Sequence, residues 1–217
     1  MKTKVVIFDL DGTLVDSFKD VYDAVNKSLE TFNEPPKDRE WVRLLIGPNA
    51  SKLIEEAVLG TNISIEDYRN EFRKNYRSQL TRTTALFDGM SSILDWLESK
   101  NTQMAVLTNK SESSSLEILK ELNILNKFIK VVGYDTYTEA KPSPLGLERI
   151  CEIADCTPEE AVLIGDTEVD IATAKAAKCP VIAITHGYRS YDELQRENPT
   201  YLATSIDELK STLEKLI

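Results

Sequence analysis

Short apolar runs, each about the length of a buried strand, recur along this chain with helical patterns between them. The runs are rich in Val, Ile and Leu at consecutive positions, which is typical of strands buried on both faces of a parallel sheet. They occupy residues 4–8, 103–107, 128–132, 161–164 and 181–184.

Apolar residues return at helical spacing between the later runs. Three such stripes are Ile93, Leu94 and Leu97; Leu116, Leu119 and Leu122; and Leu147, Ile150 and Ala154. Alternating strands and helices favour an α/β fold, in which a Rossmann-like parallel sheet has right-handed crossovers and helices on both faces.

The stretch from residue 16 to residue 84 interrupts this alternation, because it has helical spacing and no convincing strand. The capping patterns Ser17-x-x-Asp20 and Ser64-x-x-Asp67 predict two helix starts. In the later helix we expect Ile65, Tyr68 and Phe72 to point inward. We therefore predict an all-helical insertion over 16–84 in an α/β core made of residues 1–15 and 85–217.

Composition and charge narrow the class of protein. Hydrophobic residues at 41% and charged residues at 29% are typical of a soluble globular chain. The net charge of -10 argues against nucleic acid or an anionic membrane as a partner. We expect a cytoplasmic protein, because no run has the length of a membrane span and none is typical of a signal peptide. The charge is compatible with a monomer or a homodimer.

The cysteines support the same compartment. Cys151, Cys156 and Cys179 are odd in number and form no Cys-x-x-Cys pair, so we expect reduced thiols that fill the core.

Two aspartates follow the first apolar run, in Asp9-Leu10-Asp11-Gly12-Thr13. Residues two apart leave a strand on the same side. Two carboxylates repel each other by about 3 kcal/mol at 5 Å in an effective dielectric of 20. A protein tolerates this for a cation, for a shared proton or for both. The alternative is a capped turn, which fits the complete motif less well.

Three further polar motifs follow later strands, at the edge where ligands bind in open α/β sheets. Thr108 and Asn109 can donate hydrogen bonds to phosphate oxygens, although Thr-Asn after a strand is also an ordinary helix cap. Lys141, just before two prolines, can neutralise a phosphate, although a lone lysine is more often on the surface. Asp166 and Asp170 follow the run at 161–164, and acidic residues there can simply cap a helix.

Charge links these motifs. If ionised, Asp9, Asp11, Asp166 and Asp170 carry four negative charges against one positive charge on Lys141. A phosphate dianion needs a cation to enter such a pocket, and Mg²⁺ takes carboxylates, water and substrate phosphate as ligands. Zinc is disfavoured because the sequence has no Cys/His cluster. The single histidine, His186, is not expected to be catalytic.

The order and spacing of these motifs over nearly the whole chain resemble the haloacid dehalogenase-like hydrolase superfamily. The resemblance implies that Asp9 attacks phosphorus and forms an aspartyl-phosphate, while Asp11 acts as general acid and then general base. It also implies that magnesium is held by the Asp9 carboxylate, the Asp11 main-chain carbonyl and Asp166, with Asp170 in support. Thr108, Asn109 and Lys141 would hold the phosphoryl oxygens.

The helical insertion resembles the small cap of that superfamily, which excludes water and selects the leaving group. Gly47, Pro48 and Asn49 interrupt its helices and are our candidates for substrate discrimination. A plain helix–helix turn is an equal alternative.

Local sequences resemble the phosphoglycolate phosphatases of the superfamily. They are Ile46-Gly47-Pro48, Thr108-Asn109-Lys110, and the segment from His186 to Leu194. The function predicted is hydrolysis of a small phosphorylated metabolite, with 2-phosphoglycolate as best candidate. Nucleotidase, pyrophosphatase and sugar-phosphate mutase activities remain alternatives on the same scaffold.

A phosphoaspartate signalling switch is the alternative outside enzymes, since receiver domains combine the same residue types. Asp11 argues against a switch, because it supplies an acid–base group that discharges a phosphoaspartate. The helical insertion also argues against it.

Overall fold

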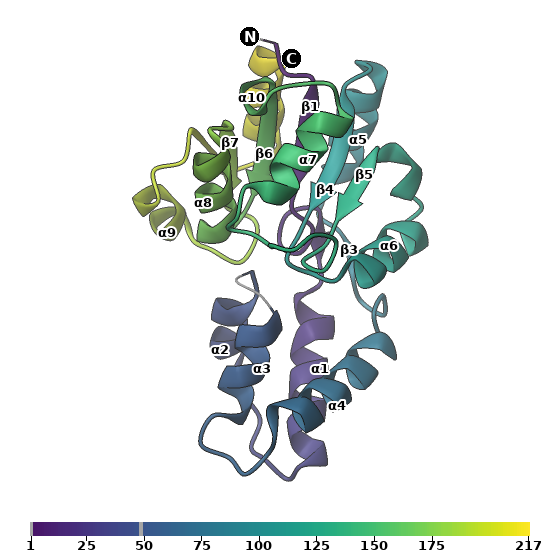
Figure 1. The fold of residues 1–217 in the computed structure, drawn as a ribbon, viewed down its shortest axis with the longest axis vertical. Coiled ribbons are helices and arrows are strands. Elements are labelled where there is room, and N and C mark those ends of the chain that lie inside the picture. The colour runs from purple at the N-terminus through teal and green to yellow at the C-terminus, as the bar shows by residue number, and fades with distance from the viewer. Residues whose placement is uncertain (1, 48–49) are drawn as a thin grey trace.

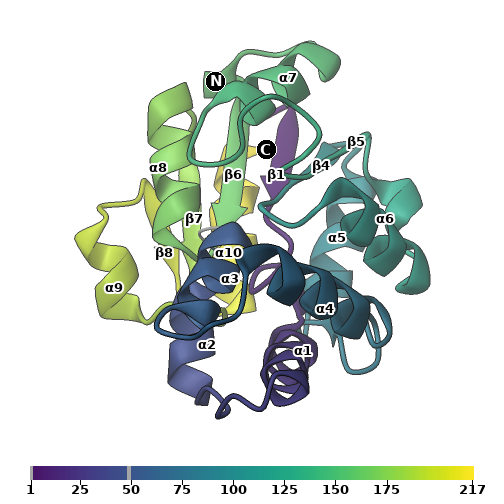
Figure 2. The same cartoon turned by 60° about the horizontal axis from the view of Figure 1, so that its bottom comes forward.

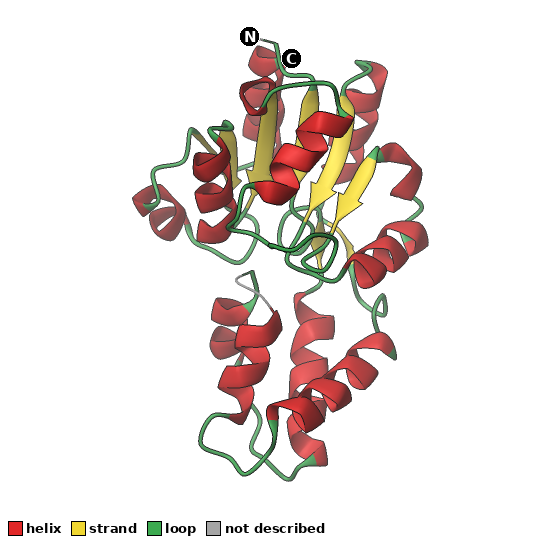
Figure 3. Ribbon diagram, viewed as in Figure 1, coloured by secondary structure: helices red, strands yellow, loops and turns green. Residues whose placement is uncertain are grey.

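The computed structural model describes residues 2–47 and 50–217 of the 217-residue chain. Its centre is a six-stranded sheet in the order β5-β4-β1-β6-β7-β8, with every neighbouring pair parallel. Figures 1 and 3 show the sheet with helices packed around it. The strands are β1 (Val5–Phe8), β4 (Gln103–Leu107), β5 (Lys130–Val132), β6 (Ala161–Gly165), β7 (Val181–Ile184) and β8 (Tyr201–Ala203). The predicted fold class is confirmed.

The central strands alternate their side chains between two hydrophobic clusters, one on each face of the sheet. In β1, Val6 and Phe8 belong to one cluster, and Val5 and Ile7 belong to the other. The first cluster includes side chains of α5 (Met90–Ser99), α6 (Glu112–Glu121) and α10 (Ile206–Leu216). The second includes side chains of α7 (Leu145–Ile153), α8 (Glu168–Ala177) and α9 (Tyr191–Arg196). Both faces are therefore covered, which explains why the strands read as continuous apolar runs.

Four helices of the segment from Phe18 to Arg77, between β1 and α5, lie beyond the carboxyl edge of the sheet (Figure 1). They are α1 (Phe18–Thr31), α2 (Arg39–Leu45), α3 (Ala50–Val58) and α4 (Ile65–Arg77). Figure 2 shows the group from below, with α2 beside α3 and α1 beside α4. A short antiparallel pair, β2 (Val15–Asp16) with β3 (Ala85–Leu86), lies where the chain leaves and rejoins the sheet. Within the described residues, no helix has the length and apolarity needed to cross a membrane.

The starts of α1 and α4 differ in how they are capped. At α4, the Ser64 side chain accepts a hydrogen bond from the Asp67 amide at 3.0 Å, so this predicted cap is confirmed. The helix start predicted after Ser17 is confirmed, because α1 begins at Phe18, but the capping bond is not formed: the Ser17 hydroxyl donates to Asp11 and caps no helix amide. The inward orientation expected for Ile65 is also wrong, because 42% of this residue is exposed.

Candidate active site

The predicted motifs meet at the carboxyl edge of the three central strands. Asp9 follows β1, Thr108 follows β4, and Asp166 follows β6. These strands are neighbours in the sheet, so residues distant in sequence become adjacent. Lys141 comes from the loop before α7, and Asp170 lies in the first turn of α8.

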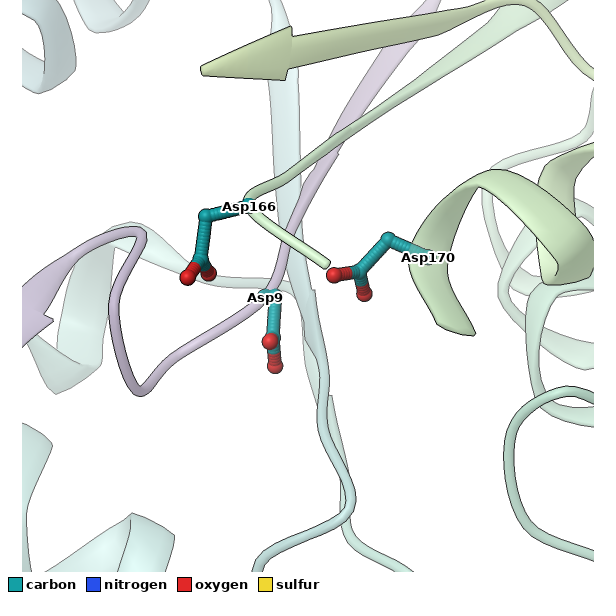
Figure 4. A group of neighbouring side chains, drawn as sticks. All are labelled: Asp9, Asp166 and Asp170. Atoms are coloured by element: carbon teal, nitrogen blue, oxygen red, sulfur yellow. The ribbon is translucent and has the colours of Figure 1, made fainter. Parts of the chain in front are cut away.

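Three carboxylates form the centre of the site. Asp9, Asp166 and Asp170 are buried, and one carboxylate oxygen of each lies within 4.8 Å of the others. Figure 4 shows the side chains of Asp166 and Asp170 on either side of Asp9. Oxygen ligands without nitrogen or sulfur suit a hard divalent cation. This donor set therefore fits a metal such as magnesium.

Lys141 is the cation of this cluster. Its buried Nζ lies 3.0 Å from Asp9 Oδ1 and 2.5 Å from Asp170 Oδ1. The other oxygen of Asp170 accepts hydrogen bonds from the amide and hydroxyl of Thr167, at 3.1 and 2.7 Å. Asp170 thus orients Lys141 while it closes the first turn of α8.

Asp166 lies in a tight cradle of backbone. Its carboxylate accepts hydrogen bonds from Thr13 Oγ1 at 2.8 Å and from the Tyr188 amide at 2.7 Å. A Cβ added at Gly12, whose φ is +83°, would lie 2.3 Å from Asp166 Oδ2, and one at Gly187 would lie equally close. Glycine at both positions lets two backbone segments approach the carboxylate, which is thereby fixed in place.

The electrostatics of the cluster favour an additional cation. The pKa of Asp9 is raised to about 7, mainly by burial and also by the charges of Asp170 and Asp11, against the opposing effect of Lys141. Burial, followed by the charges of Asp9 and Asp170, holds the pKa of Asp166 well above its usual value. The single positive charge of Lys141 does not balance the negative charge of three carboxylates, and a divalent cation would supply the missing positive charge.

The Asp11 carboxylate lies outside this triad. It accepts hydrogen bonds from Lys110 Nζ at 2.8 and 2.9 Å and from the Ser17 hydroxyl. The predicted contribution of Asp11 to metal binding is through its main-chain carbonyl, and that contribution stays a prediction. Lys110 is a site residue that the sequence does not indicate, because a lone lysine after a strand is typical of a surface position and its partner Asp11 is 99 residues away.

Thr108 and Asn109 hold the strand end against neighbouring segments. Thr108 Oγ1 accepts from the Lys110 amide at 3.2 Å. Asn109 Nδ2 lies 3.2 Å from the Gly47 carbonyl and 3.1 Å from the Lys141 carbonyl, and it donates to both. Asn109 therefore links the Lys141 loop to the helical segment. Its predicted contact with phosphoryl oxygen stays a prediction.

Gly47, in the loop proposed for substrate discrimination, lies close to Thr167 of the α/β core. A Cβ added at Gly47 would lie 2.7 Å from Thr167 Cγ2. Pro48 and Asn49 lie outside the described residues. Gly47 also lines a cavity of about 670 Å³ that reaches Asp9, Asp11 and the inner face of α4.

His186 packs in the fold, and the three cysteines form no disulfide. The imidazole Nε2 of His186 lies 3.1 Å from the Thr13 carbonyl, and its ring packs 4.3 Å from that of Phe87. Burial lowers the pKa of His186, so the ring is neutral near pH 7. Cys151, Cys156 and Cys179 are free thiols, and Cys151 and Cys179 are buried.

A parallel α/β sheet with an aspartate nucleophile candidate, a buried acidic triad and a buried lysine defines a class of hydrolases. The chain matches the haloacid dehalogenase-like hydrolase family over residues 6–184 and belongs to that family. This membership favours an enzyme over a signalling switch.

Individual relatives agree with the family assignment. The chain is 32% identical to a phosphoglycolate phosphatase of Pseudomonas putida, over 97% of this chain and 78% of the relative. It is 31% identical to a phosphoglycolate phosphatase of Colwellia psychrerythraea, over 98% of this chain and 97% of the relative. A crystal structure described as a predicted phosphoglycolate phosphatase from Haemophilus somnus has a TM-score of 0.92 at 27% identity, covering 98% of this chain and 99% of that one.

Proposed function

We propose that this chain is a magnesium-dependent phosphatase that hydrolyses a small phosphomonoester, with 2-phosphoglycolate as the best candidate. The observation that carries the proposal is the buried Asp9 carboxylate, 3.0 Å from Lys141 Nζ and inside the acidic triad. Membership of a hydrolase family and relatives named phosphoglycolate phosphatase support phosphoric monoester hydrolysis.

In this proposal, an Asp9 oxygen attacks phosphorus as the bond from phosphorus to the leaving oxygen breaks. Asp11 gives its proton to that oxygen, and the released product is an alcohol. A water molecule then attacks the aspartyl-phosphate on Asp9 and gives its proton to Asp11, which yields inorganic phosphate and free Asp9. Lys110 and Ser17 hold the Asp11 side chain for both transfers.

Asp9, Asp166 and Asp170 would hold the magnesium ion through carboxylate oxygens, together with the main-chain carbonyl of Asp11. When bound, the ion would lower the repulsion between Asp9 and the phosphate and stabilise charge on the transferring group. Lys141 orients Asp9 and provides a second positive charge, and Thr108 and Asn109 are the proposed donors to phosphoryl oxygens.

We further infer that α1–α4 act as a cap over this site. Residues 16–84 would then be the cap, and residues 1–15 and 85–217 the catalytic core. The cavity between Asp9 and α4 supports this division, because substrate entering it would contact both parts. A cytoplasmic location and a monomeric or homodimeric state stay predictions.

The decisive experiment removes the nucleophile and the metal separately. Asp9→Asn should lower phosphate release from p-nitrophenyl phosphate and from 2-phosphoglycolate by at least about a thousandfold, because an amide is a poor nucleophile toward phosphorus. Chelation by EDTA should abolish turnover, and added Mg²⁺ should restore it.

The matched control is Asp192→Asn, the same change at an exposed position on α9, which should keep full activity. Wild-type rates in the Asp9→Asn variant, or undiminished rates in EDTA, would contradict the aspartyl-phosphate mechanism.

A further inference from the structure

Helix α4 presents a basic wall to the cavity that contains Asp9. Four cations of this helix line the cavity: Arg69, Arg73, Lys74 and Arg77. None of the described α1–α4 residues that line it is acidic, although the whole chain carries a net charge of -10. The charge of this wall is therefore positive, opposite in sign to the net charge of the protein, and it favours anions inside the cavity.

Two of these cations are already neutralised and two are not. Arg69 pairs with Glu66 at 3.0 Å, and Lys74 pairs with Glu71 at 3.1 Å. Neither Arg73 nor Arg77 forms an ion pair within residues 2–47 and 50–217. They lie four residues apart, so their guanidinium groups project from the same face of the helix.

Tyr76 provides an independent indication of a ligand at this wall. Its side chain lines the cavity and only 7% of the residue is exposed, yet its hydroxyl has no hydrogen-bond partner among the described residues. Lys110 Nζ lies over the ring, 4.7 Å from its centroid. Burial raises the pKa of Tyr76 to about 12, so the hydroxyl keeps its proton and can donate it. A buried donor without a partner is costly, and a ligand acceptor would remove that cost.

We infer that Tyr76, Arg73 and Arg77 form a binding site for a second anionic group, a carboxylate or a second phosphate, on the leaving-group side of the substrate. The inference rests on the proposed phosphatase function, because the transferred phosphoryl group occupies the Asp9 end of the same cavity. The Tyr76 hydroxyl donates one hydrogen bond to the anion, and the two guanidinium groups neutralise it. Tyr76, Arg73 and Arg77 are thus specificity-determining residues of the reaction.

The test compares substrates that differ only in this group. Phosphate release is measured with Mg²⁺ present from 2-phosphoglycolate, from ethane-1,2-diol bisphosphate and from 2-hydroxyethyl phosphate, whose leaving group is neutral. The wild type should prefer one or both charged substrates by at least about tenfold in kcat/KM, equivalent to about 1.4 kcal/mol. The substrate with the higher kcat/KM identifies the bound anion as a carboxylate or a phosphate.

Two variants should remove this preference. Tyr76→Phe and the double variant Arg73→Gln/Arg77→Gln should each lower kcat/KM for the preferred charged substrate about tenfold, mainly through KM. Each should leave 2-hydroxyethyl phosphate within about twofold of wild type.

The matched control is Tyr68→Phe on the same helix. The Tyr68 hydroxyl donates to the Val25 carbonyl at 3.2 Å, away from the cavity. Tyr68→Phe should lower the urea midpoint of unfolding and keep the substrate preference. Tyr76→Phe should keep the urea midpoint and lose the substrate preference, because the Tyr76 hydroxyl donates no hydrogen bond to the described residues.

Equal rates on charged and neutral substrates, or parallel losses on both in the variants, would overturn this inference while leaving the phosphatase function intact. No hydrolysis of any of these esters, nor of p-nitrophenyl phosphate, would overturn the proposed function and the inference with it.

Discussion

Individual carboxylates in this protein have different tasks, and their hydrogen-bond partners distinguish them. Asp9 lies beside the Lys141 ammonium in the triad, whereas Asp20, later in the chain in the first turn of α1, is held by hydroxyl and amide donors. Asp20 is fully buried, and Thr83 and Thr84 each donate an amide and a hydroxyl hydrogen bond to it. These bonds join the start of α1 to the segment before β3. Asp20 is therefore a structural carboxylate of the junction.

Replacing Asp20 should destabilise the fold in a pH-dependent way. Burial opposes ionisation of Asp20, but the bonds from Thr83 and Thr84 outweigh it and lower the pKa. Because the pKa is lower in the folded chain, this stabilisation is complete above the ordinary aspartate pKa of about 3.9 and is lost as pH falls through the lowered value. Asp20→Asn should cost about 2 kcal/mol of unfolding free energy at pH 7, and the deficit should shrink below about pH 4.

Urea denaturation from pH 3 to pH 8 measures this effect. Asp23→Asn is the control on the same helix. Asp23 forms an i,i+4 pair with Lys19 near the surface, so the variant should lose about 0.5 kcal/mol or less of unfolding free energy. A deficit for Asp20→Asn that does not change with pH would show that ionisation of Asp20 contributes nothing.

At the scale of elements, the short apolar runs were sufficient to predict five strands of the sheet and its parallel arrangement. Strand β8 was missed because its three residues, Tyr201 to Ala203, form no run of Val, Ile or Leu, and Tyr201 is 38% exposed. Strand β5 has the same length and also lies at an edge, but it carries Val131 and Val132. The pair of β2 with β3 has two residues per strand, too few to show a period. Lys110 and Tyr76 could not be predicted as site residues, because each depends on contacts between segments far apart in sequence.

Arg189 makes a long-range contact of this kind, between the β7–α9 loop and the end of α2. Its guanidinium donates to the carbonyls of Arg43 at 3.1 Å and Leu44 at 3.2 Å, and pairs with Glu168 at 2.8 Å. The last carbonyls of a helix lack hydrogen-bond donors within the helix, so Arg189 supplies donors to the C-terminal carbonyls of α2. In return, Arg43 donates to the Tyr188 carbonyl.

Arg189→Ala should release the end of α2 from the core. We expect a loss of about 1–3 kcal/mol in unfolding free energy, because helix carbonyls and Glu168 lose their partner together. Hydrogen exchange followed by mass spectrometry should show faster exchange in α2 and unchanged exchange in β1 and β6. The control is Arg196→Ala, at an exposed arginine of α9. Unchanged exchange in α2 would show that Arg189 does not hold this helix.

For the whole molecule, the sequence predicted the charge imbalance of the site and the meeting of its aspartates, but not the backbone contacts that fix Asp166. The positions of Asp9, Asp166 and Asp170 after strands predicted that they would meet, because carboxyl ends of neighbouring parallel strands lie at one edge. The glycine cradle of Asp166 could not be predicted, because it depends on Gly187 reaching across from the end of β7. The folded chain thus holds three carboxylates at close range, an arrangement that the unfolded chain lacks.

Magnesium should therefore stabilise the whole fold, because the triad exists only in the native state. At one hundred times its dissociation constant, the ion contributes about 2.7 kcal/mol, which raises the Tm of a chain of this size by roughly 5–11 °C. Asp166→Asn should abolish most of this rise, since it removes a charge and turns an amide group toward donors from Thr13 or Tyr188. Asp135→Asn, at an exposed carboxylate that lines the cavity reaching Asp9, should keep the rise.

Differential scanning calorimetry with and without Mg²⁺ measures the shift in Tm. An equal shift in Asp166→Asn and wild type would place the metal elsewhere, because general attraction to an acidic chain does not require this carboxylate.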